Sequence, residues 1–63
     1  MLPPVSPEAI KSLREKHQLH QTQVAALLYV SRRTVQYWEE GGREMPLGLW
    51  ELFNVRLGEM SPI

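Results

Sequence analysis

The sequence predicts a small all-α domain of four helices. Its 63 residues contain four segments with helical start or stop signals and no strand signal. There is no cysteine, so disulfides and thiolate zinc sites are excluded. A chain this short is near the lower limit for a fold supported by an apolar core alone, and oligomerisation would supplement it. We therefore expect one domain over residues 1–63, with an extended arm at 1–5 and a tail at 59–63.

The first helix is expected to begin after Ser6 and to run through "PEAIKSLREKH". Ser6 is a good N-cap, Pro7 suits the first helical position, and Glu8 complements the positive end of the helix dipole. Ile10 and Leu13 are three positions apart, so they form an apolar face, and the polar residues between them point outward. The following "HQLHQ" is expected to break the helix, with Leu19 reaching the core from a loop.

The second and third helices are expected to be short and separated by a tight turn. Residues 22–28, "TQVAALL", have apolar residues too continuous for a surface helix, so we expect a largely buried element. Ser31 is a good N-cap for the third helix, Val35 and Trp38 form its apolar side, and the Gly-Gly pair after it ends it.

The fourth helix is expected to begin at Pro46 and to end near Leu57, before a glycine. It contains more apolar residues than one small core requires, because Leu52 and Val55 form a second stripe beside the main one. We therefore expect a twofold dimer through this helix. A single wide core face with scattered exposed apolar residues is the alternative. The predicted interface residues are Leu49, Trp50, Leu52, Phe53 and Val55.

The charges are unevenly distributed along a chain whose net charge is zero. Residues 1–38 contain five basic and two acidic residues, whereas residues 39–63 contain two basic and five acidic ones. Bulk charge therefore does not indicate nucleic-acid binding, for which a strongly basic domain is typical. The local pattern does allow it, because no acidic residue occurs between Lys16 and Trp38.

Several function classes are disfavoured by the composition. The chain has no cysteine and no aspartate, and no nucleophile, base and orienting group cluster in the sequence, so an enzyme is not expected. His17 and His20 lack acidic neighbours that could complete a metal site, so we expect no metal, no cofactor and no small-molecule ligand. No apolar run approaches a membrane span and the N-terminus does not have a signal-peptide pattern, so we expect a cytoplasmic protein.

The stretch "QTQVAALLYVSRRTVQYWEEG" resembles the helix-turn-helix of the Cro/C1-repressor (XRE-type) family, and the resemblance extends from about Leu13 to Pro46. Two positions depart from the family pattern. Tyr29 stands where the family usually has glycine in the turn, so it must adopt a positive φ or change the turn. His20 stands where a threonine or serine commonly caps the first motif helix. The matched positions are Gln21, Ala25, Leu28, Val30, Val35, Trp38 and the ending "WE-x-G".

The resemblance implies that the third helix enters the major groove of DNA, and the chemistry of its side chains agrees. Arginine can bond bidentately to guanine, and glutamine can do so to adenine. The predicted base-contacting residues are Arg32, Arg33, Gln36 and Tyr37. The predicted phosphate-contacting residues are Gln21, Thr22, Gln23, Ser31, Thr34 and Arg43, which would set the register without reading sequence. Arg14 and Glu39 occupy positions that are similar to a structural ion pair of this family.

The predicted function is a sequence-specific DNA-binding transcriptional repressor that acts as a homodimer on the inverted repeat of a palindromic operator. So small a Cro-like protein resembles autoregulators of phages and mobile elements, including the anti-CRISPR-associated group. Two alternatives remain. The first is the antitoxin of a toxin–antitoxin pair, which would need a toxin-binding surface. The second is a protein-binding adaptor that uses the same fold without DNA.

Overall fold

The computed structural model describes residues 5–59 and contains four α-helices and no strand in that range. The predicted all-α, four-helix class is therefore confirmed. The expectations for the first four residues of the arm and the last four of the tail lie outside the described residues. The helices are α1 (Pro7–Lys16), α2 (Gln21–Leu28), α3 (Arg32–Glu40) and α4 (Leu47–Arg56).

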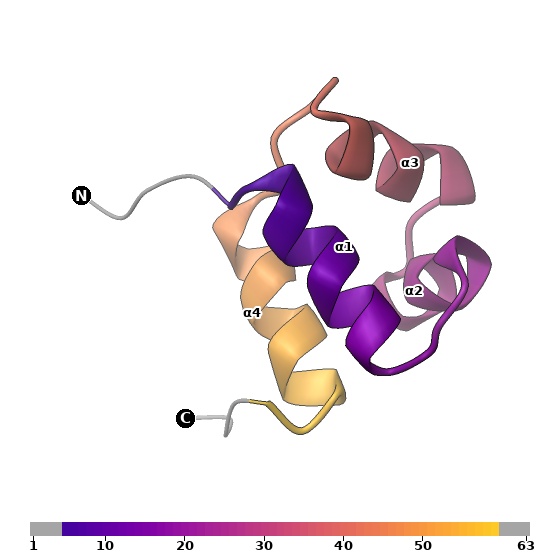
Figure 1. Cartoon of the computed structure of the whole chain (residues 1–63), viewed down its shortest axis with the longest axis vertical. Coiled ribbons are helices and arrows are strands. Elements are labelled where there is room, and N and C mark those ends of the chain that lie inside the picture. Colours follow the sequence, from indigo (N-terminus) through magenta and orange to yellow (C-terminus); the bar gives the residue numbers. More distant parts are fainter. Residues whose placement is uncertain (1–4, 60–63) are drawn as a thin grey trace.

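α2 contacts both α3 and α4, and α3 also contacts α1 (Figure 1). Figure 1 shows α1 crossing the middle of the molecule, with α3 at one edge and the loop that follows α3 at the far end of that helix from the α2–α3 turn. This arrangement leaves one long side of α3 without a covering helix. No helix within residues 5–59 has the length and apolar character needed to cross a membrane.

The core lies where the four helices meet. Val24, Val35 and Phe53 are completely buried, and Trp38 closes the core from α3. Leu19 packs against the core from the α1–α2 loop, as expected. Met45, which the sequence did not single out, is also buried, so the α3–α4 loop is held to the core close to its junction with α4.

The helix ends follow local sequence signals. Ser6 Oγ accepts a hydrogen bond from Ala9 N at 3.1 Å, and Ser31 Oγ accepts one from Thr34 N at 3.2 Å. Each serine thereby gives a side-chain acceptor to an N–H group of the first helical turn, which has no carbonyl four residues earlier in the helix to donate to. Gly41 ends α3 in the left-handed region, with a φ of 82°.

The structure corrects one part of the expectation for α4. Phe53 is completely buried in the core of the single chain, so it has no surface to offer a second copy. Leu52, assigned to a second stripe, packs against the same core as Leu49 and Trp50. The core face of α4 is therefore wide, as the alternative reading allowed. Val55 is half-buried outside that cluster, and Leu47 is 41% exposed.

Candidate nucleic-acid interface

The two adjacent arginines begin α3 and are both exposed. Val35 and Trp38 anchor one side of the helix in the core, Arg33 lies opposite that side, and Arg32 lies at its edge, beside the start of α2. Within residues 5–59 no salt bridge involves Arg32 or Arg33. Their positive charges therefore remain available to a partner at the N-terminal end of α3, where the helix dipole also favours an anion.

The other two predicted base-contacting residues are less free. Gln36 and Tyr37 are half-buried. The side-chain amide of Gln36 donates to Glu40 Oε1 at 3.3 Å, one turn along the helix. The Tyr37 ring has the Arg43 guanidinium over it, 4.8 Å from the ring centroid. The predicted reading face is therefore divided into two exposed arginines and two side chains that already have partners in the protein.

Arg14 and Glu39 form the structural ion pair that the resemblance implied. Arg14 Nε donates to Glu39 Oε2 at 2.7 Å and Arg14 Nη2 donates to Oε1 at 2.9 Å, which is a bidentate arrangement. Arg14 Nη1 also donates to the Leu19 carbonyl at 3.0 Å. The hydrogen bonds to Glu39 raise the pKa of Arg14 above its ordinary value. The guanidinium therefore holds α1, the α1–α2 loop and the end of α3 in one orientation.

Gln21 joins the same network. Its side-chain amide donates to Glu39 Oε1 at 3.3 Å, so the start of α2 is tied to the end of α3. Gln23, also predicted to contact phosphate, accepts a hydrogen bond from His20 N at 2.7 Å and so helps to cap α2. The hydroxyls of Ser31 and Thr34 lie 2.9 Å apart, beside the cap of α3. Of the predicted phosphate-contacting residues in α2, Thr22 is the one with an exposed side chain that is not used in these contacts.

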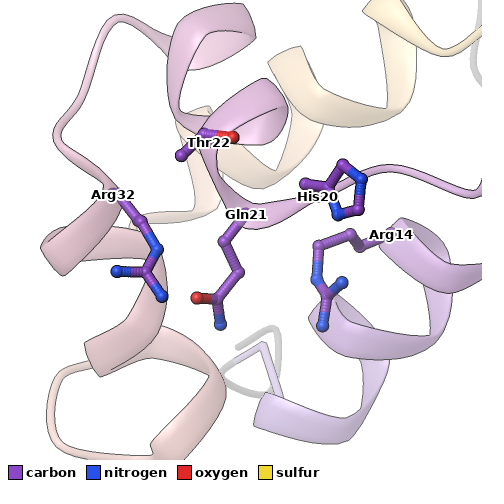
Figure 2. A pocket seen from close by; sticks show the side chains of 5 residues that line it. All are labelled: Arg14, His20, Gln21, Thr22 and Arg32. Atoms are coloured by element: carbon purple, nitrogen blue, oxygen red, sulfur yellow. The ribbon is translucent and has the colours of Figure 1, made fainter.

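A polar pocket of about 400 Å³ opens between the N-terminal ends of α2 and α3. Figure 2 shows Gln21 between Arg32 and Arg14, with His20 and Thr22 at the margins. Glu39 balances the charge of Arg14, so Arg32 supplies the unbalanced positive charge of this pocket. The fold thus brings the start of the recognition-type helix beside the start of the preceding helix, which the sequence could not show by spacing alone.

His17 contacts the chain that follows α4. Within residues 5–59 no group of three or more side chains is arranged to hold a metal ion. His17 instead lies 2.8 Å from Glu59 Oε1, and Lys16 Nζ lies 2.7 Å from the same oxygen. Two hydrogen bonds lower the pKa of Glu59, of which the one from Lys16 has the larger effect and the one from His17 the smaller. These contacts tie the chain after α4 to the C-terminal end of α1.

Tyr29 lies in the turn between α2 and α3. Tyr29 adopts the left-handed conformation with a φ of 58°, which is the first of the two outcomes expected for this position. Its side chain is 79% exposed, and the Arg56 guanidinium lies 5.2 Å from the ring centroid and donates to the hydroxyl at 3.2 Å. The turn is thus strained locally but is connected to the end of α4.

Contacts that sequence reasoning missed include those of Tyr37 with Arg43, Tyr29 with Arg56, and Gln21 with Glu39. The first had a weak signal, because an arginine in the loop directly after a helix can fold back onto an aromatic residue of the last turn. The other two pairs are 27 and 18 positions apart, so only the packing of the helices brings them together.

Comparisons with known proteins agree with this geometry. The family model described as Helix-turn-helix matches residues 10–49, which is more than half of the chain. A solved structure from Nitrosomonas europaea, named "Putative DNA Binding Protein NE0471", has a TM-score of 0.78 at 23% sequence identity. The match covers 94% of this chain and 39% of that one, so at this identity it shows a shared fold over less than half of the larger protein. A comparison with curated proteins found no match. The chain belongs to the helix-turn-helix family of the Cro/C1-repressor type.

Proposed function

We propose that this protein is a sequence-specific DNA-binding regulator that represses transcription and reads DNA with α3. The observation that supports this function best is the exposed pair Arg32 and Arg33 at the start of α3, within the family match. The polar groups at the start of α2 lie beside Arg32, where they can meet the phosphate backbone while α3 meets the bases (Figure 2). In this role the protein is not an enzyme, and its partner is double-stranded DNA.

The net charge of zero determines how such a regulator must achieve affinity. A protein without excess positive charge binds DNA weakly through nonspecific phosphate contacts. Affinity must then come from direct contacts of a few side chains and from two linked copies that bind two half-sites. We therefore propose a homodimer on an inverted repeat, with half-sites about one helical turn apart. An autoregulatory role, in a phage or other mobile element, rests on the family likeness.

The remaining apolar surface of α4 is our proposed dimer interface. Phe53 is excluded from this interface because it is buried in the core of the single chain. The candidate residues that remain are the half-buried Leu49, Trp50, Leu52 and Val55. Val55→Glu would place a charge in that surface without opening the core. We expect it to lower the apparent mass in sedimentation equilibrium from dimer to monomer and to weaken operator binding. A wild-type protein that is monomeric at micromolar concentration, and stays so on a two-site duplex, would contradict the dimer.

Selection of bound duplexes from a random pool tests the DNA-binding function itself. The expected result is an enriched inverted repeat that the protein protects in a footprint at sub-micromolar concentration and moderate salt. The double variant Arg32→Gln/Arg33→Gln should lose the enrichment. Lys11→Gln, which removes one positive charge from the exposed side of α1, is the matched control for the single variants Arg32→Gln and Arg33→Gln. Failure to enrich any sequence with the wild-type protein would refute the proposal.

A footprint of the promoter of the protein's own gene tests the narrower autoregulatory role. Protection of an inverted repeat in that promoter, relieved by Arg32→Gln/Arg33→Gln, is the expected result. Enrichment of a sequence from the random pool without any protection of this promoter would leave DNA reading intact and would refute autoregulation.

A further inference from the structure

The loop that follows α3 packs beside the half-buried side chain of Tyr37. The Tyr37 carbonyl accepts hydrogen bonds from Gly41 N and from Gly42 N, the latter at 2.9 Å. A Cβ atom placed on Gly42 would lie 3.5 Å from Cδ1 of the Tyr37 ring, so the loop backbone passes directly beside the ring. Arg43 then places its guanidinium carbon 4.8 Å from the ring centroid. The orientation of Tyr37 is therefore determined within the protein, before any partner binds.

The stacked arginine keeps its hydrogen-bonding capacity. A cation–π contact uses the charge of the guanidinium but occupies none of its five N–H donors. Glu40 and Glu44 are close to Arg43 in sequence, yet within residues 5–59 neither of them forms a salt bridge with it. Arg43 is exposed, so its donors can reach an external phosphate oxygen.

The position of Arg43 complements that of the paired arginines. Arg32 and Arg33 begin α3, whereas Arg43 follows its C-terminal end in the loop at the edge of the molecule (Figure 1). A helix of this length separates its two ends by about 13 Å, at 1.5 Å per residue. An arginine is therefore present at both ends of α3, although Glu40 and Glu44 lie close to Arg43 in the sequence.

We propose that Tyr37 and Arg43 act as one DNA-contacting unit, in which Tyr37 is a positioning residue that holds the Arg43 guanidinium toward a backbone phosphate and does not itself read a base. This inference rests on the proposed function. It replaces the expectation that Tyr37 contacts a base and assigns a larger role to Arg43. An arginine held in advance by stacking loses less conformational freedom on binding than a free one, so the ring strengthens a contact that the arginine makes.

The salt dependence of binding to the selected duplex tests this division of roles. Arg43→Gln should reduce the slope of log affinity against log salt by about 1, the value for one lost phosphate contact. Tyr37→Leu removes no charge, yet we expect it to weaken binding about two- to fivefold and to move the slope toward that of Arg43→Gln. Tyr37→Phe keeps the ring and should behave as the wild type. The double variant Tyr37→Leu/Arg43→Gln should bind no more weakly than Arg43→Gln.

Two controls separate this effect from general damage to the fold. Arg56→Gln disrupts the other arginine–tyrosine pair of the chain, at the end of α4, and should leave the slope unchanged. Proton NMR of the free protein should show ring-current shifts of the Arg43 side chain that Tyr37→Phe keeps and Tyr37→Leu removes. Thermal unfolding of each variant identifies the temperature at which all of them are folded.

The outcomes that overturn the inference differ from those that overturn the proposed function. If the wild-type protein binds no selected duplex in a gel-retardation assay, both the inference and the proposed function are refuted. If the wild type binds but Tyr37→Leu has the same salt slope as the wild type, the coupling of Tyr37 to Arg43 is overturned and the proposed function is not. The same conclusion follows if the losses of affinity in Tyr37→Leu and Arg43→Gln add up in the double variant. A changed base preference at one operator position in Tyr37→Phe would show that the tyrosine hydroxyl reads a base, which also overturns it.

Discussion

Replacing Arg14 by methionine tests how much the α1–α3 ion pair contributes to the fold. The side chain of Glu39 is 5% exposed and that of Arg14 is 16% exposed, so the change leaves a nearly buried carboxylate. Its remaining partner among the described residues is the Gln21 amide, at 3.3 Å. Removing one member of a buried pair lowers the free energy of unfolding by about 3–5 kcal/mol. Because Arg14 is partly exposed, we expect a loss at the low end of this range, about 3 kcal/mol. A domain of this length has a free energy of unfolding of only about 3–9 kcal/mol.

A double-mutant cycle separates the orphaned charge from the loss of packing. The single variants Arg14→Met and Glu39→Met and the double variant would each be unfolded by urea and by heat. We expect Arg14→Met to lower the melting temperature by roughly 10–25 °C, at about 4–8 °C per kcal/mol for a small domain. Glu39→Met should cost less, because Arg14 is more exposed and keeps its bond to the Leu19 carbonyl. The double variant should be more stable than Arg14→Met, because no buried carboxylate remains.

The reasoning would be refuted by a loss below about 0.5 kcal/mol for Arg14→Met, the value for an ordinary surface pair. It would also be refuted by additive losses in the cycle. DNA binding by Arg14→Met, measured where the variant is folded, should decline less than in Arg33→Ala, because Arg14 orients α3 whereas the proposed function places Arg33 against DNA. A larger decline in Arg14→Met would indicate that Arg14 contacts DNA itself.

Three further predictions concern single positions. Arg33→Ala should relax a preference for guanine at one position of the selected operator, whereas an equal loss of affinity for all duplexes in a competition assay would show a phosphate contact instead. Tyr29→Gly should have a free energy of unfolding about 1–2 kcal/mol higher than that of Tyr29→Val. Both variants lose the contact with Arg56, but only glycine adopts a φ of 58° freely. Equal urea midpoints for the two variants would contradict this prediction. Since the pKa of Glu59 is lowered in the folded state, its stabilising effect should be complete above about pH 4.5 and lost as the pH falls through the lowered pKa. The stability difference between wild type and Glu59→Gln should therefore narrow at low pH, and a difference that is constant from pH 7 to pH 3 would rule the contact out.

The fold was largely predictable because its determinants are local. Ser6 and Ser31 cap α1 and α3 by accepting a hydrogen bond from the backbone N–H group three residues later in the chain, and Gly41 ends α3 where a left-handed residue is needed. These effects operate within one helical turn, so the residue order alone specifies them. The apolar spacing of Val35 and Trp38 likewise predicted which side of α3 is buried and therefore which side remains outside.

The candidate site was predictable only in its exposed part. Arg32 and Arg33 could be assigned to the surface because they begin a helix whose other side is apolar. Tyr37 was assigned to the same surface by helical spacing, but the loop after α3 folds back and gives its ring a partner. Helical spacing describes where a side chain points and does not describe what the following loop covers.

By itself, the sequence determined that this chain forms four short helices with an outward-facing pair of arginines, because caps, glycines and apolar spacing act over three or four residues. The tertiary structure decided the rest. It brought Arg14 to Glu39 across 25 positions, placed Arg32 beside the start of α2, and buried Phe53 in the core instead of at a dimer surface. These outcomes depend on the angles at which the helices cross, and those angles come from the packing of all the core side chains together.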